Sequence, residues 1–262
     1  MTAFDVMLDA YRTWVDPMSR KVTAVALRRA GLAPHSRVLD VAAGLGALAL
    51  PAAEAGHRVH AIDLAEQMLA ALGTALAPYP ESTVEVMDAT ALTFPDDTFD
   101  AAFSMFGIFF FGDGVAGALA EMRRVTRPGG VVVAAHWADP MGGPMFTLLS
   151  RAAARLGDLP PIGTWGFGFL EGADLERALR GAGCTEASSE PFEIDYVLPE
   201  PERALDEMHT LFLNHPDYPH DLSPAQHERL RVALAEEVRR NDSSAELRVR
   251  ARVNIVVGHV PR

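Results

Sequence analysis

Short apolar segments alternate with amphipathic ones through the first half of the chain, and this alternation constrains the fold more than any other feature. The apolar segments, which predict strands, cover residues 37–41, 57–63, 83–87, 99–104 and 131–135. Apolar strands that alternate with helices are typical of βαβ units, in which a parallel sheet is buried on both faces. Since crossovers between parallel strands are right-handed, the pattern predicts a doubly wound, Rossmann-like α/β sheet.

The second half of the chain has a different pattern. Residues 184–197 are predicted to be extended, and residues 200–241 to be helical with an interruption near Pro216. Residues 248–257 alternate strictly, with apolar side chains on one face and three arginines on the other. Strands buried on both faces do not alternate in this way, so we expect residues 248–257 to form an antiparallel and partly exposed strand.

A glycine-rich turn follows the first predicted strand. The turn contains Gly44 and Gly46, and a helix is predicted from Ala47. Glycine lets the backbone adopt angles that a side chain forbids and come close to a ligand, while the N–H groups that open a helix bind polar or anionic groups. With Ala49, the two glycines also match the G-x-G-x-x-[GA] pattern of dinucleotide sites, so an NAD-dependent oxidoreductase is one hypothesis.

Three acidic residues end consecutive predicted strands. Asp40 lies within the end of the first strand, Asp63 ends the second, and Asp88 follows the third. The carboxyl ends of parallel strands meet at one edge of an open α/β sheet, where such sheets bind ligands. At that edge Asp63 is placed to accept both hydroxyls of a ribose, and Asp88 to accept an amino group of adenine. The alternative interpretation is that the acids only cap the helices that follow them.

The segment from Val38 to Gly46 resembles motif I of the class I methyltransferases that depend on S-adenosylmethionine (SAM), in the branch similar to the ubiquinone-biosynthesis enzymes. The resemblance covers about residues 35–137 and continues through residues 61–69, 88–95, 99–100 and 121–130. It implies a seven-stranded sheet whose last strand is antiparallel, together with a helical substrate lid. Two residues depart from the family pattern: Ala42 replaces the usual first glycine, and Leu45 replaces a usual Thr or Ser.

The resemblance also implies which residues bind the cofactor SAM, which becomes S-adenosylhomocysteine after transfer. Asp40 and the turn from Ala42 through Gly44 to Gly46 would hold the methionine part, and Asp63 would bind the ribose. The remaining contacts would come from Leu64 and Met68 on the two faces of the adenine, from Asp88 and the Ala89 backbone at its amino group, and from the Ser104 carbonyl at the ammonium group.

Aromatic residues follow the fourth and fifth predicted strands, at the same edge of the sheet. Phe106 and Phe109 form either an apolar substrate wall or part of the core. Trp137 is a candidate substrate contact, and His136 beside it is either a general base or a hydrogen-bonded loop histidine. The segment after the fourth strand lacks the Asn/Asp-Pro-Pro-Tyr/Phe motif of enzymes that methylate adenine or glutamine nitrogen, which argues against nucleic-acid bases as acceptors.

We expect the SAM-binding domain (35–262) to be covered by an N-terminal helical lid (1–34) and by a helical substrate-cap insertion at about 198–245. Tyr11 and Trp14 are candidate substrate contacts in the lid, with packing of an amphipathic helix as the alternative. His209 is a candidate substrate contact in the cap. The three histidines of the cap have spacings that fit no compact ligand motif, so we expect no metal.

Composition excludes several classes of function. A formal net charge of −12 without a basic run disfavours nucleic acid as a partner. Lys21 is the only lysine and no G-K-[ST] sequence occurs, which excludes a P-loop. The single Cys184 excludes an internal disulfide. Arg123, Arg124 and Arg127 are predicted to interact with the negative end of a helix over 115–125.

The chain lacks a membrane-length apolar segment and a signal peptide, so we expect a cytoplasmic protein with no membrane partner. The leading hypothesis is methyl transfer from SAM to an O, N or C atom of a small, partly apolar metabolite. Besides the NAD-dependent oxidoreductase, the alternative is a SAM-binding protein that transfers no methyl group and acts in regulation or in a cyclisation. The sequence leaves the oligomeric state open.

Overall fold

A computed structural model gives the structure of the chain, and it describes residues 11–12, 15–138, 143–159, 171–198, 221–241 and 247–262. The helices are α3 (Asp16–Ala30), α4 (Ala49–Glu54), α5 (Glu66–Leu76), the 3-10 helix η1 (Ile108–Gly114), α6 (Val115–Val125), α7 (Pro144–Leu156), α8 (Gly172–Gly181) and α10 (Pro224–Asn241). The strands are β1 (Arg37–Val41), β2 (Arg58–Asp63), β3 (Thr83–Val86), β4 (Phe99–Met105), β5 (Thr126–Trp137), β6 (Thr185–Leu198) and β7 (Leu247–His259).

The strands form one seven-stranded sheet in the order β3-β2-β1-β4-β5-β7-β6. β1 pairs in parallel with β2 and β4, β2 pairs in parallel with β3, and β4 with β5. β7 runs antiparallel to both of its neighbours, β5 and β6. The predicted fold class and the antiparallel last strand are therefore confirmed. The direction of winding reverses between β1 and β4, which is the place where open α/β sheets bind ligands.

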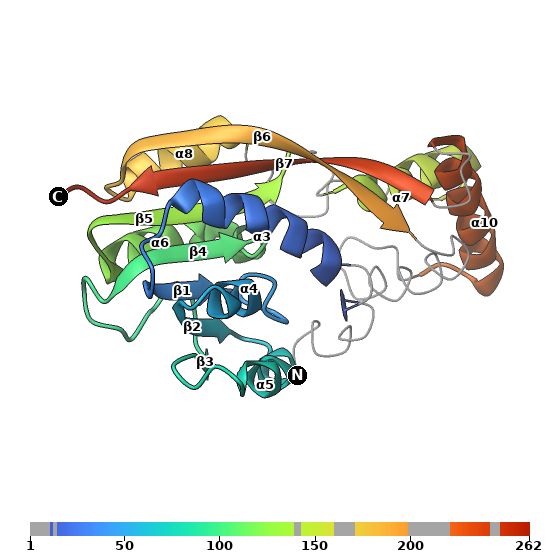
Figure 1. Ribbon diagram of the computed structural model, residues 1–262. Coiled ribbons are helices and arrows are strands. Elements are labelled where there is room, and N and C mark those ends of the chain that lie inside the picture. Colours follow the sequence, from blue (N-terminus) through green and yellow to red (C-terminus); the bar gives the residue numbers. More distant parts are fainter. Residues whose placement is uncertain (1–10, 13–14, 139–142, 160–170, 199–220, 242–246) are drawn as a thin grey trace.

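The two faces of the sheet carry separate cores, because alternate residues of each strand point to opposite faces. Phe103 and Val133 belong to a first core with residues of α3, α4 and α5. Ala102 and Val132 belong to a second core with residues of α6 and α8. Figure 1 shows α3 and α4 in front of the sheet and α6 behind it.

Prolines lie at the start of α3 and within β5. Pro17 is in the first turn of α3, where its missing N–H is not needed. Residues 127–130 have the sequence Arg-Pro-Gly-Gly, which is typical of a turn, but they lie within β5. Gly129 donates to the Val260 carbonyl and Val260 donates to the Gly130 carbonyl, both at 2.9 Å, which extends the pairing.

β6 and β7 extend beyond the strand beside them. β5 pairs with β7 as far as Trp137, whereas β6 and β7 stay paired as far as Leu198 and Leu247. α7 and α10 pack against each other at this end of the sheet (Figure 1). α10 falls within the cap predicted at about 198–245, and much of that cap lies outside the described residues, so the division into lid, domain and cap stays a prediction. No helix among the described residues is long and apolar enough to cross a membrane.

α3 is held across the last two strands by basic side chains. Nη1 of Arg29 donates to the carbonyl oxygens of Glu190 (3.2 Å) and Ile255 (3.4 Å), while its Nη2 forms an ion pair with the Glu190 carboxylate at 2.8 Å. Nζ of Lys21 donates to the Asp195 carbonyl at 3.2 Å. α3 therefore contacts the backbone of β6, which is the edge strand of the sheet formed by the described residues.

Candidate cofactor-binding site

The turn after β1 has a left-handed backbone at Ala42 (φ 57°), Gly44 (φ 54°) and Gly46 (φ 84°). A Cβ atom on Gly46 would collide with the Leu72 side chain of α5, so glycine is required there both for the backbone angle and for packing. Ala42 stands where the family has glycine, and it adopts the left-handed conformation at a cost of about 1–2 kcal/mol. The turn thus keeps its shape despite this departure from the family pattern.

Asp40 lies at the end of β1 and is 1% exposed. Its Oδ2 accepts a hydrogen bond from the Ala49 N–H at 3.0 Å, at the start of α4. Burial, and to a lesser degree the nearby Asp63 carboxylate, raise the pKa of Asp40 to about 7, against the lowering effect of the Ala49 bond. A buried carboxylate of this kind favours a cation beside it.

Asp63 ends β2 and connects the glycine turn to α5. Its Oδ2 accepts from the Gly44 N–H at 2.8 Å, and its Oδ1 accepts from the Ala65 N–H at 3.0 Å. The structure therefore brings Asp40, Asp63 and the turn together at the edge between β1 and β2. The second of these bonds lies just before α5, whose first turn begins at Glu66 and which has no side-chain capping bond among the described residues.

The residues predicted around the adenine follow β2 and β3. Leu64 is exposed by 57%, whereas Met68 and Ala89 are buried. Oδ1 of Asp88 accepts from both the N–H and the hydroxyl of Thr90, each at 2.8 Å, and these bonds lower the pKa of Asp88. Asp88 is thus an exposed, ionised carboxylate beside the sheet edge.

Tyr11 lies over the glycine turn. Its hydroxyl is 3.3 Å from the position that a Cβ atom on Gly44 would occupy. Its ring packs against the small cluster of Leu45, Ala65 and Met68. Burial raises the pKa of Tyr11, and the carboxylates of Asp16, Asp63 and Asp40 raise it further. The predicted lid residue therefore contacts the predicted cofactor turn. Trp14 and His209 lie outside the described residues.

Phe106 and Trp137 form an aromatic pair at the carboxyl edge of β4 and β5. Their ring centroids are 4.8 Å apart, and both rings pack with the first core. Phe106 has a left-handed backbone (φ 60°), which is uncommon for a bulky residue and often marks a functional site. Phe109 follows in η1.

His136 and Ser104 lie on the other face of the sheet from the aromatic pair. Their neighbours Ala102, Val132 and Ala134 belong to the second core, which α6 and α8 cover. His136 is 4% exposed, and burial lowers its pKa to about 4. Within the described part of the chain, neither Nε2 of His136 nor the buried Ser104 hydroxyl has a hydrogen-bond partner. Among the described residues, no group of His, Cys, Asp and Glu side chains could hold a metal ion.

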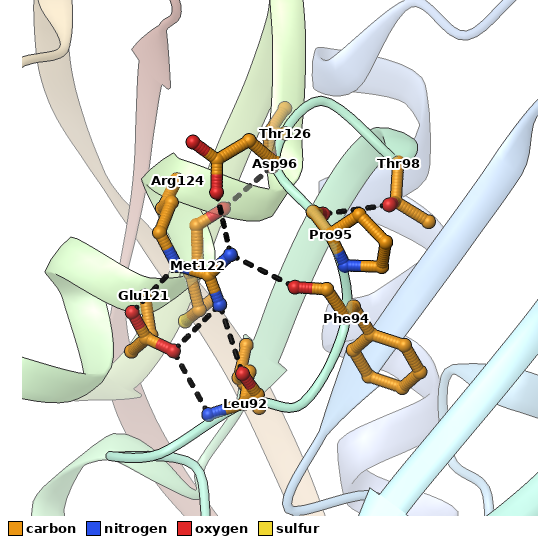
Figure 2. A network of polar contacts seen from close by, with 9 residues as sticks. All are labelled: Leu92, Phe94, Pro95, Asp96, Thr98, Glu121, Met122, Arg124 and Thr126. Carbon is orange, nitrogen blue, oxygen red and sulfur yellow. Dashed lines mark hydrogen bonds and ion pairs between the residues drawn. The ribbon is translucent and has the colours of Figure 1, made fainter.

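Two features of the structure were not predicted from the sequence. Gly107 lies so close to the turn that a Cβ atom there would collide with Cβ of Ala42. Arg124 lies in the last turn of α6, as predicted, and in addition forms a network with Glu121 and the loop after β3 (Figure 2). Glu121 and Arg124 belong to a motif that was identified in the sequence. Their contacts were not evident from it, because Arg124 binds backbone carbonyls, which every residue carries whatever its side chain.

The strand order, the glycine turn after β1 and the acids at the ends of β1 and β2 define a class I SAM-dependent methyltransferase fold. Residues 39–134 match the family model described as "Methyltransferase domain". Residues 39–134 are therefore similar to methyltransferase domains, and the resemblance predicted from the sequence is confirmed.

Relatives and solved structures agree with this assignment. A demethylmenaquinone methyltransferase of Renibacterium salmoninarum is 37% identical over 163 residues, which cover 61% of this chain and 66% of that protein. An uncharacterized protein of Mycobacterium tuberculosis is 34% identical over 163 residues, covering 61% of this chain and 59% of the relative. The chain thus spans about three fifths of the length of these relatives.

Among solved structures, a putative methyltransferase from an antibiotic biosynthesis pathway of Anabaena variabilis has a TM-score of 0.63 at 17% identity, covering 90% of this chain and 96% of that chain. The YcgJ protein of Bacillus subtilis has a TM-score of 0.61 at 16% identity, covering 92% and 98%. At these identities the likeness concerns the fold.

Proposed function

We propose that the chain transfers the methyl group of SAM to an O, N or C atom of a small, partly apolar metabolite. The observation that carries this proposal is the meeting of Asp40, Asp63 and the Gly44 turn where the sheet reverses its winding. The relatives named demethylmenaquinone methyltransferases support a small apolar acceptor. The NAD-dependent alternative receives no such support.

The charges at the glycine turn fit SAM. The sulfonium and ammonium groups of SAM are cations, and the buried Asp40 carboxyl, with its pKa of about 7, is a group that a cation would ionise. Asp63 would bind the ribose hydroxyls in addition to its backbone contacts, which hold its carboxylate in place. The turn from Ala42 through Gly44 to Gly46 would approach the methionine part closely.

The nucleoside end of the cofactor would lie beyond Asp63. Leu64 and Met68 would flank the adenine, and Asp88 would accept its amino group next to the Ala89 backbone. Because both Thr90 bonds end on Oδ1 of Asp88, its Oδ2 is the oxygen that would receive this bond. On this assignment the large exposed surface of Leu64 is covered only when the cofactor is bound.

The residues around the methyl acceptor would mainly orient the acceptor relative to SAM. SAM supplies the electrophilic methyl group when bound, and an in-line displacement gains much of its rate from a fixed arrangement of the reactants. Tyr11 would close over the cofactor, with Trp14 and His209 as further contacts from the lid and cap. Phe106, Phe109 and Trp137 would line the apolar part of the acceptor site, and the Ser104 carbonyl would bind the SAM ammonium.

A second candidate function is SAM binding without methyl transfer, and the position of His136 favours it. The proposed general base lies on the sheet face opposite the Phe106–Trp137 pair, and its pKa of about 4 makes it a weak proton acceptor. His136 would therefore act as a base only if the acceptor reached the face that α8 covers.

Titration calorimetry with SAM tests the cofactor site. We expect Asp63→Ala to weaken SAM binding by at least about tenfold, since a charge-assisted bond to the ribose and the anchor of the turn are both lost. Glu66→Ala is the matched control, because Glu66 is an exposed acid in the first turn of α5. Equal affinities in the wild type and in Asp63→Ala would refute the assignment.

Transfer is tested separately by incubating the protein with SAM that carries a labelled methyl group and a panel of apolar metabolites with hydroxyl, amine or enol groups. Label in a product, abolished by Asp63→Ala, supports the enzyme. Tight SAM binding with no labelled product across the panel would favour the second candidate.

A further inference from the structure

The loop that joins β3 to β4 is fastened to α6 by the guanidinium group of Arg124 (Figure 2). Nη2 of Arg124 donates to the carbonyl of Leu92 at 2.9 Å, and Nη1 donates to the carbonyl of Phe94 at 2.8 Å. Nη1 also donates to the Asp96 carboxylate at 2.7 Å. One side chain thus fixes three positions of the loop.

Glu121 holds Arg124 in this orientation. Nε and Nη2 of Arg124 donate to the two carboxylate oxygens of Glu121, both at 2.8 Å, as a bidentate pair. Oε2 of Glu121 also accepts from the Leu92 N–H at 2.9 Å. All five N–H groups of the guanidinium are therefore used, and a lysine could not reproduce this planar fork.

The fastened loop begins with the residues proposed to bind the adenine. Asp88 and Leu92 are four residues apart, and the turn between them is closed by the bond from the Ala91 N–H to the Asp88 carbonyl (3.1 Å) and by the bonds from Thr90 to the Asp88 carboxylate. The Cγ2 atom of Thr90 is 3.1 Å from the position that a Cβ atom on Gly114 would occupy, just before α6. The turn is therefore in contact with the start of α6 through Thr90 and with its end through Arg124.

We infer that Arg124 is a positioning residue for the nucleobase end of the cofactor site. It holds Leu92 and Phe94, which fixes the turn that orients the Asp88 carboxylate, and so it sets how strongly the site prefers adenine to a base without the amino group. This inference rests on the proposed function, because it assumes that Asp88 binds the amino group of adenine. If the bonds of Arg124 only stabilised the fold, their loss would not change the preference of the site for adenine.

Calorimetry with two ligands tests the inference: S-adenosylhomocysteine, and its inosine analogue, in which a carbonyl replaces the amino group. We expect the wild type to prefer the adenine ligand about tenfold, as one charge-assisted bond allows. In Arg124→Lys the preference is expected to fall to about twofold, and in Asp88→Ala to about the same value. Adding Arg124→Lys to Asp88→Ala is then expected to change it no further.

Arg127→Lys is the matched control, because Arg127 forms an ion pair with Asp100 beside the same helix end, and should keep the tenfold preference. Glu121→Gln, which retains the shape of the side chain, serves as a second variant if Arg124→Lys does not fold, and its preference is expected to fall between twofold and tenfold.

The outcomes separate the inference from the proposed function. If Arg124→Lys, or Glu121→Gln in its place, weakens both ligands equally, the role is purely structural and the inference is overturned. A wild type that binds both ligands equally well also overturns it, because Asp88 then does not read the amino group. A wild type that binds neither ligand overturns the proposed function itself.

Discussion

The carboxyl group of Asp40 links the electrostatics of the site to pH. Its pKa of about 7 lies above the ordinary value of 3.8, because burial disfavours the charged form. A raised pKa in the folded state means that the protonated form stabilises the fold below about pH 4 and that this contribution is lost as the pH rises through about 7. A cation bound beside Asp40 would instead favour the charged carboxylate.

We therefore expect wild-type stability, measured relative to Asp40→Asn, to fall by about 1 kcal/mol per pH unit between about pH 4 and 7. Over the same window the affinity for SAM should rise in the wild type and stay flat in Asp40→Asn. Urea unfolding and calorimetry at several pH values measure the two effects. Parallel pH profiles of wild type and variant would contradict the assignment.

Ala42 and Gly107 form a coupled pair beside the cofactor turn. Ala42→Gly should raise the free energy of unfolding by about 1 kcal/mol, because the left-handed conformation suits glycine. Gly107→Ala should lower it by about 2 kcal/mol, because the new methyl group would collide with Cβ of Ala42.

The double variant tests the coupling. Ala42→Gly removes one of the atoms with which the new methyl group collides, so we expect Gly107→Ala to cost about 1 kcal/mol less in that background. The rescue is partial because Ser104 Oγ also lies 2.9 Å from the new Cβ position. Strictly additive effects in urea unfolding would show that the two positions are not coupled.

At the scale of elements, α3 is joined to the edge of the sheet mainly through Arg29. Arg29→Ala should lower the free energy of unfolding by about 1–2 kcal/mol, because bonds to the carbonyls of Glu190 and Ile255 are lost together with the ion pair. The neighbouring Arg28 is exposed, so Arg28→Ala is the control and should change stability by less than about 0.5 kcal/mol. Similar urea midpoints for the two variants would argue against this role.

The elements themselves were largely predictable, since buried strands and the final alternating strand leave clear patterns in the sequence. The extension of β5 through residues 127–130 was not, because those residues are typical of a turn. Their pairing depends on Val260, which is distant in the sequence, and nothing in the sequence around Val260 indicates that it pairs with residues 129 and 130.

For the whole molecule, the sequence indicated that Asp40, Asp63 and the glycine turn would meet, because the carboxyl ends of parallel strands share one edge. It did not reveal that His136 and Trp137 belong to opposite faces of the sheet, because the predicted strand ended at residue 135 whereas β5 continues through Trp137. The contacts of Arg124 were also hidden, since three of its partners, Leu92, Phe94 and Asp96, are reached across 28–32 residues of sequence.

Lys21 offers a practical site for attaching a single reporter group. It is the only lysine of the chain, and its ammonium group is exposed on α3 beside the backbone of β6. An amine-reactive fluorophore therefore has a single side-chain target, on the helix that follows Tyr11 and next to the strands that extend past the ligand edge. One covalent reporter can thus be attached to α3 without any engineered cysteine.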